Sequence, residues 1–280
     1  MQHGVQRPHS LLSNPRTPMA DEKIRFDDGA GYEQMMGKWS QLVGAGFLDW
    51  LELPAGLKWL DVGCGNGAFT EMLVDRCAPS AISGIDPSEG QLRYARERPA
   101  SRLASFQLGD AMALPFANHE FDTAVMALVI FFVSDPAKGV AEMVRVVRPG
   151  GWVSAYAWDI LEGGFPLAAV QDQMRAMGIT PMLPPSAAVS KMAALRAAWT
   201  DGGLESVQTT EITVKRTFAD FDDYWRTAML GSSVGPKVAA MSPADRERLS
   251  AGVRDRLGVS GAGQITISAR ANAVRGRVPG

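Results

Sequence analysis

The sequence predicts an α/β fold in which helices cover both faces of a mostly parallel sheet. Short apolar segments, suited to buried strands, alternate with segments of helical periodicity between residues 57 and 157. The first apolar segment runs directly into a glycine-rich turn and then a helix, over residues 57–73. This order of strand, glycine turn and helix is typical of a Rossmann-like, doubly wound sheet that binds a nucleotide-like cofactor.

Composition limits the class of protein. Hydrophobic residues make up 46% of the 280 residues and charged residues 21%, which is ordinary for a soluble globular domain. The formal net charge of −2 gives no electrostatic footprint for nucleic acid, and no apolar run reaches transmembrane length. The two cysteines, Cys64 and Cys77, form no disulfide framework and suit a reducing compartment. We therefore expect a cytoplasmic protein that binds neither nucleic acid nor membrane.

The N-terminal part divides into a leader and a helix. Residues 1–24 are rich in Pro, Ser, Asn and Arg without periodicity, so we expect a disordered leader before a single domain of residues 25–280. Met19 is an alternative start. A helix is predicted over residues 32–53, because apolar residues recur at helical spacings until Pro54.

The glycine turn after the first strand matches G-x-G-x-x-A at Gly63, Gly65 and Ala68. Glycine allows positive φ and lets the backbone approach a ligand closely. The pattern alone also suits NAD or FAD. Asp61, two positions before the first glycine, discriminates between cofactors. An ionised carboxylate disfavours a dinucleotide pyrophosphate and favours a cofactor that carries ammonium and sulfonium groups.

Residues 60–67, Leu-Asp-Val-Gly-Cys-Gly-Asn-Gly, resemble the first motif of class I S-adenosylmethionine-dependent methyltransferases. The Arg-Pro-Gly-Gly turn at residues 148–151 is similar to that of the ubiquinone/menaquinone-type (methyltransferase type 11) branch, which acts on small molecules. The resemblance extends through Trp152 in order and spacing. It implies S-adenosylmethionine as cofactor, S-adenosylhomocysteine as product and a small-molecule acceptor.

Residues 81–86 predict a second strand that ends in Asp86. Asp86 lies about twenty residues beyond the loop, the distance at which an acid reaches ribose hydroxyls. Capping of a helix is the alternative role. Ser88 is predicted to cap a helix over residues 89–98.

Residues 106–110 predict a third strand, again with an acid at its end. Asp110, followed by Ala111 and Met112, resembles the adenine-binding position of the family, where a carboxylate accepts from the adenine amino group. A turn-forming Asp is the alternative interpretation.

The fourth strand is predicted over residues 121–128, and residues 124–133 are almost wholly apolar, as in a buried parallel strand. His119 precedes this strand, so we expect a surface turn residue, because ligands bind beyond the carboxyl ends of parallel strands. Without another histidine in residues 25–280 or a cysteine cluster, no metal site is expected. Asp135 is predicted to cap the next helix, which residues 149–151 end before a fifth strand at residues 152–157.

The branch often carries a His pair where this chain has Phe131 and Phe132. The departure removes a proton acceptor and favours an apolar or aromatic substrate wall, with core packing as the alternative for one of the two.

The last third predicts a helix over residues 187–200, a strand over 204–218 and a final strand over 264–274. In the family the final strand runs antiparallel beside the fifth. Two stretches interrupt this plan, at residues 160–185 and 220–259, and carry aromatic and Met side chains. We expect helical lid insertions over the substrate, with a packing appendage as the alternative.

The site residues come from the loop, the strand ends, the first helix and the insertions. Cofactor contacts are predicted for Tyr32, Met36, Trp39 and Ser40 of the first helix, where plain core packing is the alternative, and for Asp61, Gly63, Cys64, Gly65, Asp86, Pro87, Asp110, Ala111, Met112 and Leu128. Substrate contacts are predicted for Phe132, Phe165, Tyr224 and Trp225. The catalytic base is unknown, and candidates by position are Tyr32, Tyr156, Asp159 and Glu162.

The predicted function is methyl transfer to a small-molecule acceptor by in-line displacement. An NAD-dependent oxidoreductase is the alternative enzyme, and Asp61 and Asp110 argue against it. A protein that binds S-adenosylmethionine without transferring the methyl is the second alternative. Nucleic-acid methylation is not expected, because residues 128–132 lack the Asn/Asp-Pro-Pro-aromatic motif.

Overall fold

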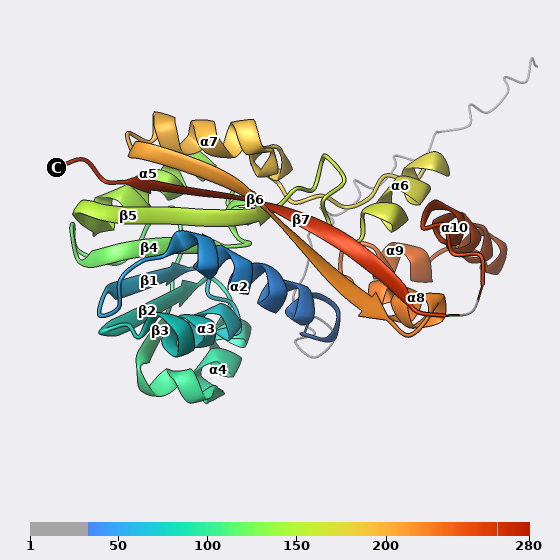
Figure 1. Cartoon of the computed structure of the whole chain (residues 1–280), viewed down its shortest axis with the longest axis horizontal. Helices are drawn as coiled ribbons and strands as arrows, with labels where there is room; N and C mark the ends of the chain where they lie inside the picture. Colours follow the sequence, from blue (N-terminus) through green and yellow to red (C-terminus); the bar gives the residue numbers. More distant parts are fainter. Residues whose placement is uncertain (1–32, 262) are drawn as a thin grey trace, which may run out of the picture.

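The computed structural model describes residues 33–261 and 263–280, so residues 1–24 and Tyr32 lie outside the described part. Its centre is a seven-stranded sheet in the order β3-β2-β1-β4-β5-β7-β6 (Figure 1). β7 lies between β5 and β6 and is antiparallel to both, while the strands from β3 to β5 are parallel. The predicted doubly wound sheet with an antiparallel last strand is confirmed. The strands are β1 (Lys58–Val62), β2 (Ala81–Asp86), β3 (Ala104–Leu108), β4 (Phe121–Ala127), β5 (Val147–Trp158), β6 (Glu205–Phe218) and β7 (Ile265–Arg277).

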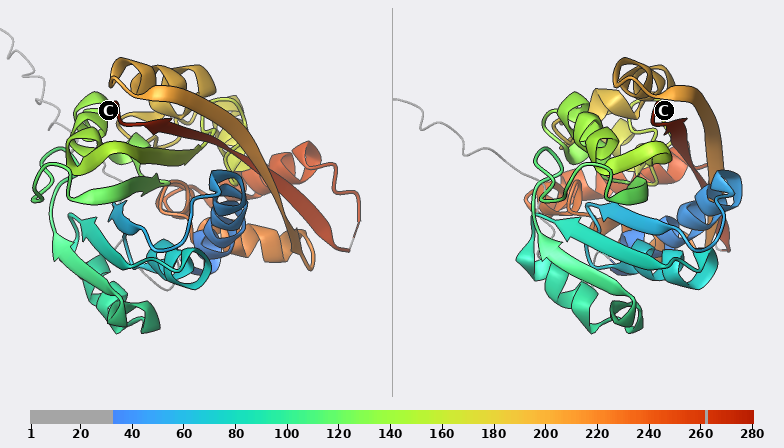
Figure 2. Two further views of the ribbon diagram at one scale, coloured as in Figure 1. Left: turned by 60° about the vertical axis from the view of Figure 1, so that its left-hand side comes forward. Right: turned by 90° about the vertical axis from the view of Figure 1, so that its left-hand side faces the viewer.

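Helices cover both faces of this sheet. α2 (Lys38–Leu51), which continues the π-helical turn η1 (Glu33–Gly37), lies with α3 (Ala68–Cys77) on one face. α5 (Pro136–Val146) and α7 (Met192–Asp201) lie on the other (Figures 1 and 2). α4 (Glu89–Glu97) packs against β2 and β3. Three short 3₁₀ helices complete this part: η2 (Pro99–Arg102), η3 (Ile130–Phe132) and η4 (Ala187–Ser190).

Two predicted caps form as expected. The Ser88 hydroxyl accepts from the Gln91 amide at the start of α4, and the Asp135 carboxylate accepts from the Lys138 amide at the start of α5. α5 also begins with Pro136, where no amide partner is needed. The capping side chains just before α4 and α5 therefore determine where these two helices begin.

The third and fourth predicted strands are too long at their ends. β3 ends at Leu108, two residues before Asp110. β4 ends at Ala127 because Leu128 adopts a left-handed φ of 61°, after which η3 begins. The predicted end of the fourth strand at Leu128 is therefore one residue too far, and the apolar run that continues to residue 133 contains η3 instead of a strand. Apolar side chains at a turn between a strand and a 3₁₀ helix look like a strand in sequence.

Two further boundaries differ. α5 ends at Val146, and β5 already begins at Val147, which pairs with Phe121, so the Arg-Pro-Gly-Gly turn lies within an irregular part of β5. The predicted helix over residues 187–200 is divided into η4 and α7 by extended backbone at Lys191.

The insertions gather beyond one end of the sheet. β6 and β7 extend past the other strands and reach α8 (Phe221–Met229), α9 (Gly235–Ala239) and α10 (Pro243–Arg256) (Figure 1). α6 (Ala168–Ala176), from the first insertion, packs against α10. One apolar cluster joins the sheet to both insertions, and includes Leu167, Phe221 and Leu249. The helical insertions are thus confirmed as structure, and their action as a lid stays a prediction.

The strand order reverses at β1, which pairs with β2 on one side and β4 on the other. In open α/β sheets, ligands bind in the crevice that this reversal opens at the carboxyl ends of the strands. Within the described ranges, no helix is long and apolar enough to cross a membrane.

Candidate functional site

A cavity of about 310 Å³ lies at the strand reversal, and we call it the glycine-loop cavity. The carboxyl ends of β1, β2 and β4 supply its floor, with the turn before α3 beside them. α2 contributes Ser40 and Gln41 to the opposite wall. Segments far apart in sequence therefore meet at the place where this sheet type binds ligands.

The glycines shape the loop in two ways. Gly63 has φ of 77°, and a Cβ there would lie 2.5 Å from the side chain of Val129, so only glycine lets the loop pack against η3. Gly65 has φ of 52° and no atom within 4 Å of an added Cβ. Its amide donates to Asp86 Oδ2 at 3.0 Å. The loop thus leaves open space where a ligand can approach the backbone.

Asp61 is a buried carboxylate at the end of β1 that lines the cavity. Thr70 donates its hydroxyl to Asp61 Oδ2 at 2.6 Å. The other oxygen, Oδ1, has no hydrogen-bond partner among the described residues. Burial raises the pKa of Asp61 from 3.8 to about 7, against the lowering effect of Thr70, and the charge of Asp86 adds to the rise. A hydrogen-bond donor or a positive charge in the cavity would therefore stabilise the ionised form of Asp61.

Asp86 stands at the end of β2, partly buried, on the same cavity. Its Oδ1 accepts from the Ser88 amide at 2.8 Å and its Oδ2 from the Gly65 amide. Burial raises the pKa of Asp86, while these two backbone hydrogen bonds lower it. Each oxygen keeps a further lone pair, so the carboxylate can also accept from hydroxyls in the cavity.

The remaining walls are largely apolar. Phe69 and Met72 of α3 and Tyr156 of β5 line the cavity, and the Tyr156 ring packs 4.6 Å from that of Phe47. Cys64 is buried in the loop, and burial raises the pKa of its thiol. A protonated thiol in this position is no nucleophile.

A second, smaller cavity of about 60 Å³ adjoins the first, and we call it the inner chamber. Leu128 and Phe132 line both cavities. The rest of its wall comes from η1, η3, the end of β5 and both insertions, through residues that include Met35, Met36, Phe131, Trp158, Phe165, Gln171 and Ser233. The two insertions therefore meet beside the glycine-loop cavity.

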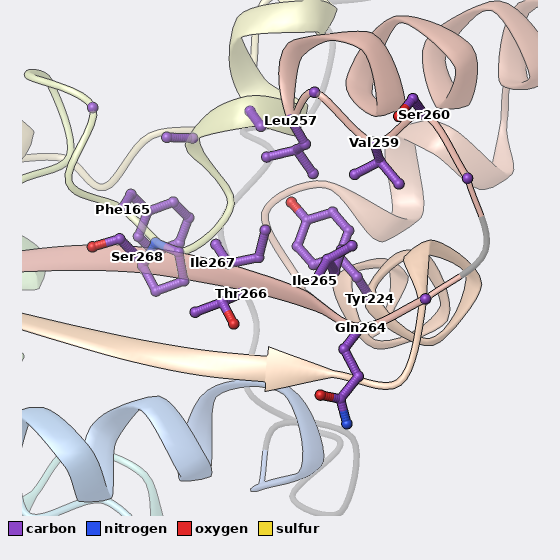
Figure 3. Close-up of a pocket in the computed structure, with 17 residues that line it drawn as sticks. Phe165, Tyr224, Leu257, Val259, Ser260, Gln264, Ile265, Thr266, Ile267 and Ser268 are labelled. Carbon is purple, nitrogen blue, oxygen red and sulfur yellow. The ribbon is translucent and has the colours of Figure 1, made fainter.

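A third cavity, of about 640 Å³, lies around the start of β7 and is here called the outer cavity (Figure 3). Phe165, Tyr224 and Leu257 are among its lining residues. Burial raises the pKa of Tyr224, and its hydroxyl has no partner among the described side chains and backbone groups. Phe165 separates this cavity from the inner chamber, because it lines both.

The structure brings most predicted site residues together. The glycine-loop cavity is lined by Ser40, Asp61, Gly63, Cys64, Gly65, Asp86, Pro87, Leu128, Phe132 and Tyr156. Met36 and Phe165 line the inner chamber, and Tyr224 lines the outer cavity. Their contacts with cofactor or substrate stay predictions.

Other predicted site residues lie elsewhere. Trp39 is buried with its ring 6.5 Å from that of Trp158, and Trp225 stacks on Phe221. Asp110 is exposed and accepts from the Met112 amide, as a turn-forming Asp does, and neither they nor Ala111 line the glycine-loop cavity. In this structure these positions do not contribute to the cavity walls.

Two candidate bases are held away from both cavities. Asp159 is buried and forms an ion pair with Arg270 of β7. Glu162 is exposed and lies 3.5 Å from Lys191. Of the described candidates, only Tyr156 faces the glycine-loop cavity. In the part of the chain that the structure describes, no group of His, Cys, Asp or Glu could hold a metal ion.

Several lining residues were not predicted as site residues. In the glycine-loop cavity they include Gln41, Asn66, Phe69 and Met72, and in the inner chamber Trp158 and Gln171. Gln171 carried a signal in the sequence: it shares one helical face with Leu167, Val170 and Met174, where an apolar residue is expected.

Sheet order, glycine loop and strand-end carboxylates together define a Rossmann-like fold with a site for a nucleotide-containing cofactor. Residues 60–155 match a family model described as methyltransferase domain. The resemblance to class I methyltransferases that the sequence predicts is thereby confirmed.

Individual relatives are similar to the chain over part of its length. The chain is 36% identical over 108 residues to a demethylmenaquinone methyltransferase of Desulfitobacterium hafniense. This alignment covers 37% of this chain and 43% of the relative. It is 30% identical over 189 residues to an uncharacterised protein of Mycobacterium tuberculosis, with 66% of each chain covered. The matches thus span less than two thirds of these relatives' lengths.

The same fold occurs in a solved methyltransferase. Phosphoethanolamine N-methyltransferase 2 of Haemonchus contortus, solved in complex with S-adenosyl-L-methionine, superimposes with a TM-score of 0.56. The alignment covers 91% of this chain and 57% of that chain at 16% identity, which shows a shared fold.

Proposed function

We propose that this protein is an S-adenosylmethionine-dependent methyltransferase that acts on a small-molecule acceptor in a reducing, cytoplasmic compartment. The observation that carries the proposal is the Oδ1 of Asp61, a buried carboxylate oxygen on the wall of the glycine-loop cavity that has no hydrogen-bond partner among the described residues. A cofactor whose amino-acid end carries an ammonium group can pair with this carboxylate oxygen. A dinucleotide pyrophosphate would instead place negative charge beside the carboxylate.

The cavity fits the rest of the cofactor as well. Gly63 and Gly65 keep the backbone accessible, and Asp86 has acceptor capacity for ribose hydroxyls. Phe69, Met72 and Tyr156 offer aromatic and thioether surfaces, which suit a sulfonium. When bound, S-adenosylmethionine supplies an activated methyl group.

The chain's own contribution is positioning and exclusion of water. Leu128 and Phe132 form the wall common to the glycine-loop cavity and the inner chamber, so an acceptor in the chamber lies next to the cofactor. Holding two reactants in line in a dry site lowers the barrier by at most about 7–11 kcal/mol. The relative from Desulfitobacterium hafniense is named for a small-molecule acceptor, which supports the same class here.

Calorimetry on the full chain tests the proposal. S-adenosylhomocysteine is expected to bind and NADH is not, because Asp61 opposes a pyrophosphate at the loop. Binding of NADH without any response to S-adenosylhomocysteine would overturn the proposal. Transfer itself is measured as S-adenosylhomocysteine released from S-adenosylmethionine when small-molecule cell extract is added, and its absence would favour a binding protein.

A further inference from the structure

β3 is the strand at one end of the sheet, and its outer edge has no paired strand among the described residues (Figure 1). The Leu103 carbonyl and the Gly109 amide both form hydrogen bonds with β2. Because main-chain groups alternate in direction along a strand, residues 104, 106 and 108 point their amides and carbonyls away from β2. This edge therefore offers donors and acceptors that an added strand can use.

The β3 edge lacks the usual protection against such pairing. Edge strands are commonly guarded by charged side chains or bulges, yet residues 103–109 include no charged residue. Arg96 of α4 donates to the outward Phe106 carbonyl at 3.4 Å, but this arginine is exposed and the hydrogen bond is long. The opposite edge of the sheet, β6, has a register irregularity and carries Glu205, Glu211, Lys215 and Arg216.

The side chains around the β3 edge are apolar and strongly exposed. Among the described large hydrophobic residues, Leu103, Leu108 and Tyr94 have the highest exposed fractions, at 57%, 57% and 56%. Leu103 precedes β3, Leu108 ends it, and Tyr94 belongs to α4, which packs against β3. Single exposed apolar side chains are ordinary, but three at one edge of a sheet indicate an interaction surface.

The segment around β3 is complementary to a second copy of itself. Antiparallel pairing through the outward residues, with Phe106 opposite Phe106, uses all three of them on each strand. In this register each exposed leucine faces a small residue, and opposite charges meet at both ends. The opposed pairs are Leu103 with Gly109, Leu108 with Ala104, Ser105 with Gln107, and Arg102 with Asp110. A two-fold axis repeats each match in both halves of the interface.

We propose that β3 is a dimerisation surface, at which two copies of this chain pair their β3 strands antiparallel about a two-fold axis at Phe106. The two sheets then continue into one another, and main-chain hydrogen bonds replace the long one from Arg96. The contact is confined to a short strand and neighbouring side chains, so the association is reversible. None of residues 103–109 lines the glycine-loop cavity, and the dimer does not rest on the proposed methyl transfer.

Sedimentation equilibrium of the full chain, between about 1 and 200 μM, measures this association. Leu108→Lys and Asp110→Lys should each weaken the dimer about tenfold or more, because each change occurs twice at a two-fold interface. Arg102→Asp combined with Asp110→Lys should restore association, since the charges are exchanged. Leu230→Lys is the matched control: Leu230 is 40% exposed but lies after α8, away from β3. Circular dichroism verifies the fold of each variant.

Disulfide trapping tests the register. Ser105 and Gln107 of opposed strands would form a non-hydrogen-bonded pair, with Cα atoms about 4.5 Å apart, whereas the two copies of either residue would be about 8 Å apart. Mild oxidation of Ser105→Cys mixed with Gln107→Cys should therefore give mostly mixed disulfide dimers, because Cα atoms farther apart than about 7 Å are not bridged. Both variants carry Cys77→Ser, since Cys77 is partly exposed and Cys64 is buried.

A wild-type chain that stays monomeric over the whole concentration range would overturn the proposal. A dimer that Leu108→Lys and Asp110→Lys leave intact would place the interface elsewhere. Loss of association in Leu230→Lys, or failure of the charge exchange to restore the dimer, would also contradict β3 pairing. Disulfides formed equally well between identical and mixed variants would refute the register centred on Phe106.

Discussion

We expect Asp61 to couple proton binding to cofactor binding. Its pKa of about 7 lies above the ordinary 3.8, so the folded protein holds this proton more tightly than the unfolded chain. Its contribution to the free energy of unfolding is therefore fully present below about pH 4 and lost as the pH rises through about 7. A cationic ligand beside Asp61 favours the ionised form and releases the proton.

We accordingly predict that the affinity for S-adenosylmethionine rises with pH up to about pH 7 and levels off above it. One released proton gives at most about a tenfold change per pH unit below the pKa. Calorimetry between about pH 5.5 and 8 measures this, with Asp61→Asn as the comparison. The variant should bind weakly and with little pH dependence. An unchanged pH profile in Asp61→Asn would place the titrating group elsewhere, with Asp86 as the nearest described candidate.

Asp86 is expected to hold both the loop and the ribose. Asp86→Ala removes the carboxylate that accepts from the Gly65 and Ser88 amides, and with it any hydrogen bond to a ligand hydroxyl in the cavity. Each such charge-assisted hydrogen bond contributes about 1.5–3 kcal/mol to the stability of the structure or complex that contains it. Cofactor affinity should therefore fall at least tenfold in a folded variant. Asp86→Asn keeps one acceptor oxygen and should show a smaller loss. Circular dichroism verifies folding, and an unchanged dissociation constant for Asp86→Ala would leave the residue only its capping role.

At the scale of elements, the glycine loop packs closely against the start of η3 because Gly63 has no side chain. Gly63→Ala would place a Cβ 2.5 Å from Val129 at a φ of 77°. Left-handed backbone costs a non-glycine residue about 1–2 kcal/mol, and overpacking adds about 1–3 kcal/mol. Gly56→Ala is the matched control, with φ of 81° but no atom within 4 Å of the added Cβ.

Urea unfolding should therefore show a larger stability loss for Gly63→Ala than for Gly56→Ala, by about 1–3 kcal/mol. Cofactor binding should weaken only in Gly63→Ala, because its loop lines the cavity. Equal losses in both variants would mean that η3 moves away without cost.

The insertions are tied to the sheet at defined points. The Asp159 carboxylate pairs with Arg270, and the Gly164 carbonyl accepts from the Arg270 amide. A Cβ on Gly164 would meet the Arg270 carbonyl at 2.6 Å, so this glycine is closely packed. At the other end of the first insertion, Ser186 donates its hydroxyl to the Val133 carbonyl. These contacts tie the first insertion to the sheet at both of its ends.

For the whole molecule, we predict that residues 160–185 and 220–259 exchange amide hydrogens faster without cofactor and become protected when S-adenosylhomocysteine binds. The reason is that both insertions line the inner chamber beside the glycine-loop cavity, so their closure over a bound cofactor would protect their amides. Hydrogen exchange followed by mass spectrometry measures this. β1 and β4 serve as internal references. Protection equal to that of the sheet in both states would make the insertions fixed structure.

Local sequence determined much of this molecule. The caps Ser88 and Asp135, the strands β1 and β2, and the glycine loop follow from backbone chemistry and periodicity within a few residues. The same holds for the positions of Asp61 and Asp86 at the ends of their strands, because parallel strands bring their carboxyl ends together. The antiparallel β7 beside β5 follows from the family resemblance.

Only the tertiary structure decided where apolar segments stop being strands and which side chains share a cavity. Leu128 turns the chain at the end of β4, and Phe132, Trp158 and Gln171 meet around one chamber although three elements carry them. Periodicity reports that a face is buried, but not what it is buried against, because packing partners are distant in sequence. The unpartnered atoms of Asp61 and Gln171 are visible only once every neighbouring group has been placed, since a hydrogen bond is a property of two positions and not of one.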